Sequence, residues 1–126
     1  MSESQNPKDL AGQSKAPLHL IPPAANIAES AVMLLGAEKY GAYNWRKTSV
    51  LASVYYSAAL RHLSAWFDGE DNDSESGVSH LAHVRANMGI LIDAKMVCQL
   101  VDDRPAAGVS NYALMGIQER IKKELL

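Results

Sequence analysis

The chain is poor in cysteine and has no long hydrophobic run. Cys98 is its one cysteine in 126 residues, so no disulfide can form within the chain, and this composition favours a reducing compartment. No apolar run approaches the roughly 20 residues that a membrane-spanning helix needs. The first 16 residues are polar, unlike a secretory signal with its apolar segment. We therefore expect a cytoplasmic protein without membrane contact.

Strong charge of one sign and several catalytic signatures are also missing. The formal net charge of -2 argues against a general nucleic-acid-binding protein, although a nucleotide substrate needs only a few local cations. There is no Walker-type phosphate loop, no Rossmann fingerprint and no Gly-x-Ser-x-Gly elbow. Cys98 has no histidine near it in sequence, which disfavours thiol catalysis.

The patterns that are present predict a single all-α domain over residues 1–126, a small bundle of about four helices. Apolar residues make up 48% of the chain and recur at helical rather than strand spacing. A core of this size is small, so we expect a homo-oligomer, a dimer or a tetramer. The expected segments are an irregular arm over 1–23, helices over 24–40, 49–67, 76 or 78 to 101, and 110–126, and a linker over 102–109.

The stretch 61–87 gathers most of the groups that could carry chemistry. Five carboxylates lie within residues 68–75, namely Asp68, Glu70, Asp71, Asp73 and Glu75. Three of the four histidines flank them, namely His62, His80 and His83. An acidic turn between two apolar helices, bordered by imidazoles, is typical of a site for a divalent cation.

Helical phasing predicts where these side chains point. His62 falls within the apolar face of the helix over 49–67, while His80, His83 and Asn87 share one face of the next helix. Glu38 continues the stripe of Ile27, Ala31 and Leu34 in the helix over 24–40. The structural alternatives are a core histidine with one hydrogen bond, a solvated acidic loop, and a Glu38 that lies in solvent.

We expect the metal ligands to come from this set. Carboxylates suit Mg²⁺ and Mn²⁺, and imidazole shifts the preference toward Mn²⁺, Co²⁺ or Zn²⁺. Such an ion would bridge phosphate oxygens and lower the pKa of a bound water. The candidate ligands are Glu70, Asp73, His80 and His83, followed by Glu38, His62 and Glu75.

A second group of residues, over 39–49, suits a nucleotide. Here aromatic and cationic side chains alternate beside an amide, which provides stacking, charge and an edge-reading hydrogen bond. The alternative is a helix connection in which Trp45 fills the core. The candidate substrate-binding residues are Lys39, Asn44, Trp45 and Arg46, together with Arg61 from the following helix.

Three blocks of sequence resemble a known family. They are PKDLAGQSKAPLHLIPP, EKYGAYNWR and RHLSAWFDGEDNDSESGVSHLAHVRAN. Together they cover roughly residues 6–95 and resemble the phage dATP/dGTP diphosphohydrolases of the MazZ type, which are related to the all-α MazG-like nucleoside triphosphate pyrophosphohydrolases. The residues after Pro105 add nothing to this resemblance.

The resemblance implies a reaction and a cofactor. A purine deoxynucleoside triphosphate, dGTP or dATP, would be hydrolysed to the monophosphate and pyrophosphate with Mg²⁺, Mn²⁺ or Co²⁺. In phages with such enzymes the dGMP feeds synthesis of a modified purine, 2-aminoadenine, and dATP is depleted. General cleaning of the nucleotide pool is the plain alternative for this chain.

The sequence departs from the MazG-like pattern at the ligands. Those enzymes carry Glu-x-x-Glu on one helix and Glu-x-x-Asp on the next. The first motif is absent here, and Glu70-x-x-Asp73 matches the second only by spacing, in a predicted loop. We assign catalysis to Glu70, Asp73 and His83. The competing hypotheses are a non-catalytic protein that binds metal or nucleotide and regulates a phage partner, and a purely structural oligomer.

Overall fold

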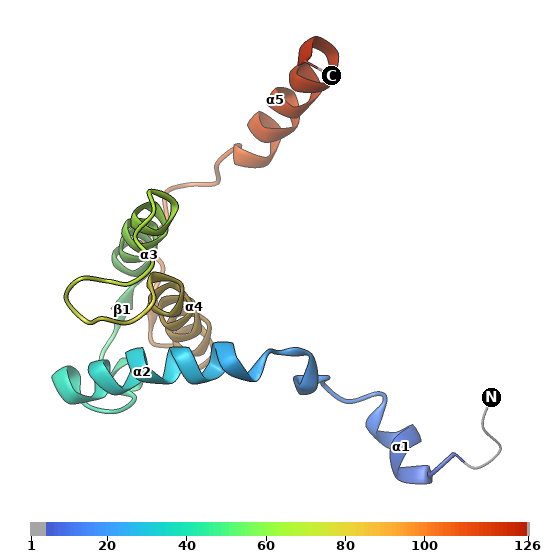
Figure 1. Cartoon of the computed structure of the whole chain (residues 1–126), viewed down its shortest axis with the longest axis vertical. Coiled ribbons are helices and arrows are strands. Elements are labelled where there is room, and N and C mark those ends of the chain that lie inside the picture. The colour runs from blue at the N-terminus through green and yellow to red at the C-terminus, as the bar shows by residue number, and fades with distance from the viewer. Residues whose placement is uncertain (1–4, 126) are drawn as a thin grey trace.

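Three helices pack against one another in the computed structural model (Figure 1). They are α2 (Pro23–Tyr40), α3 (Ala52–Phe67) and α4 (His80–Met96). The structure describes residues 5–125. Its shorter or more distant elements are α1 (Pro7–Gly12), the 3-10 turns η1 (Leu18–Leu20) and η2 (Asn44–Arg46), β1 (Val50–Leu51), β2 (Leu100–Val101) and α5 (Ser110–Leu125). The predicted all-α class, with four substantial helices among the described residues, is confirmed.

The ends of the helices follow from local chemistry. Pro23 opens α2, where its missing N–H costs nothing, and Gly41 ends it with a φ of 92° that only glycine adopts easily. The hydroxyl of Ser79 caps α4 by accepting a hydrogen bond from the backbone N of Leu81 at 3.1 Å. These signals explain why the expected helix over 24–40 agrees with α2 almost residue for residue.

The chain departs from the expected helices on either side of a small parallel sheet. The helix expected from 49 starts at Ala52, and the one expected to reach 101 ends at Met96. Cys98 turns the chain with a left-handed φ of 61°, after which β2 pairs with β1. Strands of two residues are too short to show an alternating pattern, so they are not detectable in the sequence.

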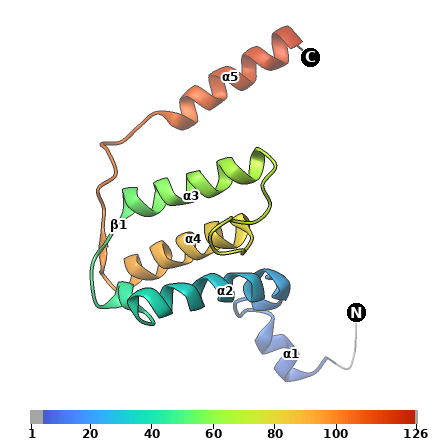
Figure 2. The ribbon, with the colours of Figure 1, turned by 60° about the vertical axis from the view of Figure 1, so that its left-hand side comes forward.

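The arm also has more structure than expected. Pro7–Gly12 forms the short helix α1, which the side chain of Asn6 caps by accepting from the backbone N of Lys8 at 2.8 Å. Figure 2 shows α1 at one end of the molecule and α5 at the other, both apart from the three-helix bundle. None of the helices within residues 5–125 is both long and apolar enough to cross a membrane.

Small residues form the contact between α3 and α4. The buried apolar side chains of these helices are all alanines, namely Ala52, Ala59, Ala82, Ala86 and Ala94. Alanine lets two helix backbones approach closely, because no long side chain stands between them. This close contact is what brings polar groups on the two helices within bonding distance.

The large apolar stripe expected on α2 does not face this core. Ile27 is 70% exposed and Leu34 60% exposed, whereas the neighbouring face presents Glu29 and Met33 to Gly89 of α4. The phasing was therefore right about which residues share a face and wrong about which face the bundle buries. Glu38, at the end of the same stripe, is exposed as well.

A change at the alanine contact tests its importance. We expect Ala86→Leu to lower the free energy of unfolding by about 1–3 kcal/mol, because three extra carbons must fit into a closed helix contact. The same change at the exposed Ala24, at the start of α2, should have little effect. Urea unfolding of both variants measures the difference. Equal stability of the two variants would contradict the close packing.

Candidate metal and nucleotide site

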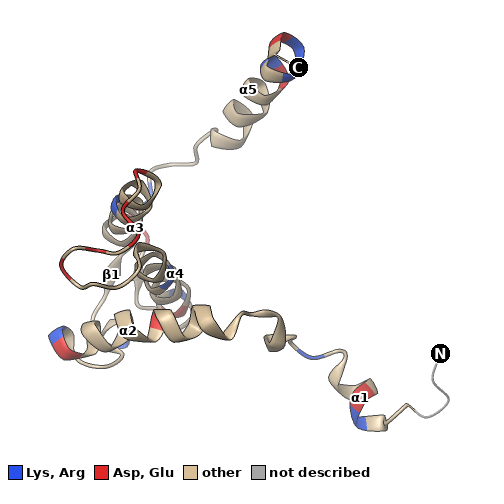
Figure 3. Cartoon of the chain, viewed as in Figure 1, with Lys and Arg blue, Asp and Glu red and all other residues tan. Residues whose placement is uncertain are grey.

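The loop between α3 and α4 is acidic but ordered by its own hydrogen bonds (Figure 3). The backbone N of Asp73 donates to the carbonyl of Val78 at 2.9 Å, and the N of Gly77 donates back to the Asp73 carbonyl at 2.8 Å. The Asp73 carboxylate accepts from the backbone N of Ser76 at 2.9 Å. Asp73 is thus held in one position.

Three imidazoles meet beside this loop. His62 of α3 and His80 of α4 bring their Nδ1 atoms to 2.8 Å, and the ring of His83 stacks on His62 with centroids 4.3 Å apart. Donor atoms of His62, Asp73 and His80 all lie within 4.8 Å of one another. The structure thus brings together residues 18 positions apart on two different helices.

Glu70 lies behind His80. Its carboxylate oxygen is 2.6 Å from Nε2 of His80, whose side chain is only 4% exposed. A carboxylate accepts at this distance, so Nε2 carries the proton and Nδ1 keeps its lone pair for the cluster. This carboxylate–histidine arrangement is how proteins orient a metal-binding imidazole from outside.

The surroundings of His62 and His83 favour the neutral imidazole. Burial is the main cause that lowers the pKa of His62, and the neighbouring His83 and His80 lower it further. Burial likewise lowers the pKa of His83, against the opposing charge of Asp73. The backbone hydrogen bond from Ser76 is the main cause that lowers the pKa of Asp73. Neutral imidazoles and an ionised carboxylate are the forms that bind a cation.

Two of the predicted phosphate-binding cations act on this cluster. The charge of Lys39, near the end of α2, lowers the pKa of His83, and that of Arg61 lowers the pKa of His62. Glu38 and Glu75 are exposed, and neither forms an ion pair with another residue in the described range 5–125. The donor atoms that lie within 4.8 Å of one another belong to His62, Asp73 and His80.

Trp45 and Arg46 have a partner that the sequence did not reveal. The Asp93 carboxylate on α4 accepts two hydrogen bonds from Arg46, both at 2.8 Å, and one from the indole N–H of Trp45 at 2.7 Å. The hydrogen bond from Arg46 is the main cause that lowers the pKa of Asp93 to about 2. Asp93 thus ties η2 to α4, and no spacing in the sequence signals a pair 47 residues apart.

Ser76 is the second residue that sequence reasoning missed. Its hydroxyl lies 2.7 Å from Nε2 of His83 and also accepts from the backbone N of Val78 at 3.1 Å. Ser76 therefore orients an imidazole and, through its N–H, the Asp73 carboxylate. Its place in the polar loop was the available signal, but a serine between Glu75 and Gly77 is also ordinary turn chemistry.

The lowered histidine pKa values predict a pH-dependent stability. When the pH falls below about 6.5, the unfolded chain takes up protons that the folded chain refuses, so folding is destabilised. We expect the urea concentration at the unfolding midpoint of the EDTA-treated protein to fall as the pH is lowered from about 7.5 to 5.5. The variant His62→Phe should show a smaller fall. His19→Phe, in the exposed turn η1, is the control. An unchanged pH dependence in His62→Phe would contradict the assignment.

Comparison with known proteins identifies the family of the chain. Residues 5–104 match the family described as dATP/dGTP diphosphohydrolase, N-terminal. A protein of Salmonella phage PMBT28, named dATP/dGTP diphosphohydrolase, is 28% identical over 110 residues. That alignment covers 86% of this chain but 35% of the phage protein, so the chain spans about a third of the relative's length. No solved structure matches. Because the family match covers most of the chain, including every residue of the histidine cluster, the chain belongs to the dATP/dGTP diphosphohydrolase family through its N-terminal domain.

Proposed function

We propose that this chain carries the active site of a metal-dependent diphosphohydrolase acting on purine deoxynucleoside triphosphates. The observation that carries the proposal is the convergence of His62, His80 and Asp73, whose donor atoms lie within 4.8 Å of one another. Such donors suit a triphosphate, which binds both metal ions and basic side chains, and the charges of Lys39 and Arg61 act on His83 and His62. The description of the family, dATP/dGTP diphosphohydrolase, supports this choice of substrate class.

The donor set fits a divalent ion. Two imidazole nitrogens and a carboxylate favour Mn²⁺ or Co²⁺ over Mg²⁺, which prefers an all-oxygen shell. We assign His62 Nδ1, His80 Nδ1 and Asp73 as ligands and Glu70 as the carboxylate that orients His80. An ion bound there would supply Lewis-acid polarisation of the phosphate and a water of lowered pKa.

The chain's own residues would handle the charge and the proton. The water oxygen attacks the α-phosphorus, the bond from that phosphorus to the bridging oxygen breaks, and pyrophosphate leaves with the electron pair. His83, neutral and bonded to Ser76, accepts the proton of the attacking water. Lys39 and Arg61 offset the charge of the leaving pyrophosphate. Arg46 contributes through Asp93 to the position of η2 rather than through phosphate.

The monophosphate product is compatible with two cellular roles. The monophosphate could enter a modified-purine pathway of a phage, or its formation could simply clear the nucleotide from the pool. The alternative of a non-catalytic binding protein has the same cluster but no turnover. Product identification separates the enzyme from the binding protein, because only a diphosphohydrolase converts the triphosphate to monophosphate and pyrophosphate in one step.

With dGTP and dATP as substrates, we expect turnover with Mn²⁺ or Co²⁺ that EDTA abolishes. The role assigned to Glu70 predicts a partial loss of metal affinity when its charge is removed. Glu70→Gln should weaken Mn²⁺ binding about 10- to 100-fold, the usual cost of losing a carboxylate behind a ligand histidine. Titration calorimetry measures the binding, and chromatography identifies the products.

Glu75→Gln is the matched control for that experiment. It makes the same substitution in the same loop at an exposed carboxylate without an ion pair in the described chain, so its Mn²⁺ affinity should stay at the wild-type value. Equal losses in both variants would mean that the loop attracts the ion by its charge alone. Release of intact triphosphate from dGTP would place the chain in another class of phosphohydrolase.

We also propose that the chain assembles with copies of itself. It exposes 10,075 Å² of surface, whereas a compact monomer of 13.7 kDa exposes about 6,600 Å². The excess is more than the roughly 800 Å² that each partner buries in a standard interface. Several of the exposed side chains are large and apolar, such as Ile27 and Leu34 on α2 and Ile117 on α5.

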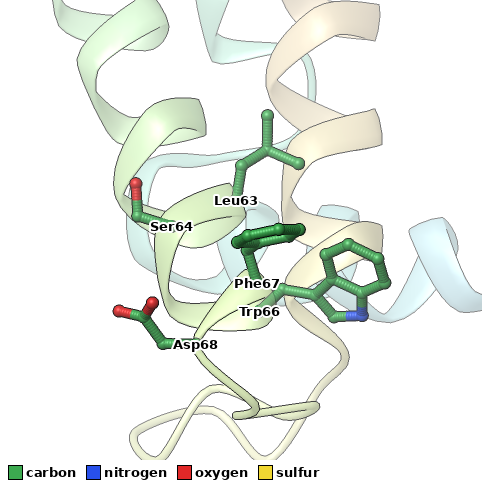
Figure 4. Close-up of a pocket in the computed structure, with 5 residues that line it drawn as sticks. All are labelled: Leu63, Ser64, Trp66, Phe67 and Asp68. Atoms are coloured by element: carbon green, nitrogen blue, oxygen red, sulfur yellow. The ribbon is translucent and has the colours of Figure 1, made fainter. Parts of the chain in front are cut away.

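Two surfaces support this assembly. The last turn of α3 presents Trp66 and Phe67 beside Leu63 around a shallow hollow, and Phe67 is 84% exposed (Figure 4). α5 carries the apolar stripe Ile117, Ile121 and neighbours without packing on the bundle. A second copy of the chain would cover the apolar side chains of these faces.

Substitution in α5 tests the assembly. Ile117→Asp places a charge in the stripe and should raise the dissociation constant of the oligomer by at least about tenfold, as loss of a central interface residue does. Lys123→Asp, on the opposite, charged side of α5, should leave it within about twofold. Analytical ultracentrifugation measures both. A wild-type protein that sediments as a monomer would exclude this assembly.

A further inference from the structure

A second cavity lies beside the histidine cluster. Its volume is about 230 Å³, and it forms where the end of α2, η2, α3 and α4 meet. Its lining consists of Tyr40, Asn44, Val54, Tyr55, Ala58 and Asn87. None of these side chains carries a formal charge at neutral pH.

 The cavity volume is 230 Å³, below the roughly 300–1,000 Å³ of pockets that enclose a whole ligand, so it suits one ring system of a larger molecule.

The cavity adjoins the cluster along both helices. Ala58 precedes His62 by four residues on α3, and Asn87 follows His83 by four residues on α4. Residues four apart share a helix face and lie about 6 Å apart along the axis. A ligand that reached from the imidazoles into the cavity would therefore need to span about one helical turn.

The chemistry of the lining differs from that of the cluster. Asn44 and Asn87 each offer an amide donor and a carbonyl acceptor, and neither side chain forms a hydrogen bond with another residue of the described range 5–125. Burial is the main cause that raises the pKa of the Tyr55 phenol, which therefore stays neutral. Unpaired amides beside phenol rings suit a flat heteroaromatic ring with polar edges.

Together the two sites have the polarity of a nucleotide. On one side lie cations and metal-binding donors for phosphate, and on the other lie uncharged amides and aromatic rings. A phosphate or a metal ion would find no charged partner in the cavity itself. Trp45 does not line this cavity, and its indole N–H donates to Asp93 at 2.7 Å.

We infer that this cavity is the base-binding subsite, in which Asn44 and Asn87 bind the edge of a purine and Tyr55 contacts its face. The inference rests on the proposed function, because it takes the phosphates to lie at the histidine cluster. Asn87 is thereby a specificity-determining residue: it links base recognition to His83 through a single turn of α4. The sequence pattern placed Asn87 beside the histidines but assigned it no role.

The first test compares nucleotides in a matched pair of variants. Asn87→Leu keeps the size of the side chain and removes its hydrogen bonds, so the preference for purine over pyrimidine deoxynucleoside triphosphates should fall about tenfold in kcat/KM. Asn111→Leu makes the same change at an exposed site in α5 and should preserve the wild-type preference. Mn²⁺ affinity should be unchanged in both variants. Equal loss of activity toward all nucleotides in Asn87→Leu would overturn the subsite.

The second test does not depend on turnover. Deoxyguanosine has no phosphate, so it can report on the cavity alone. Its addition to the wild-type protein should shift the side-chain amide NMR signals of Asn44 and Asn87 and leave that of Asn111 in place. Such shifts without hydrolysis of any nucleotide would reject the proposed function and keep the subsite. Hydrolysis of dGTP by a protein whose amide signals do not shift at high deoxyguanosine concentration would reject the subsite and keep the proposed function.

Discussion

The close contact of α3 with α4 is the constraint on which the rest of the structure depends. Alanines such as Ala59 and Ala86 line the buried contact, and the absence of longer side chains lets the two backbones approach. Only at that separation can His62 and His80 bring their Nδ1 atoms to 2.8 Å. The intervening loop then closes over the cluster, since its ends are fixed by the two helices.

Asp93 makes a second attachment, between η2 and α4, which is of comparable importance for the small cavity. It holds Trp45 and Arg46, and with them the turn η2, against α4. Asn44, the first residue of η2, lines the small cavity because of this attachment. The aromatic and the cation that suggest nucleotide contact thus also hold η2 on α4, while the less conspicuous amide beside them lines the cavity.

The sequence predicts the chemistry of the cluster better than its packing. Helical phasing placed His80, His83 and Asn87 on one face; in the structure His80 and His83 both contact His62, and Asn87 lines the small cavity. Phasing alone could not tell which apolar stripe the bundle buries, and Ile27 and Leu34 proved to be exposed. Nor could it find Asp93, since a pair of residues far apart in sequence leaves no periodic signal.

The exposed apolar side chains and the polar site between α3 and α4 share one physical explanation. The inner faces of α3 and α4 carry small and polar residues, which serve the site but bury little apolar surface. The larger apolar side chains lie outside, where burial of about 25 cal/mol per Å² becomes available only through contact with another surface. A helix pair that uses its inner face for chemistry therefore has to obtain much of its hydrophobic stabilisation from its outer face.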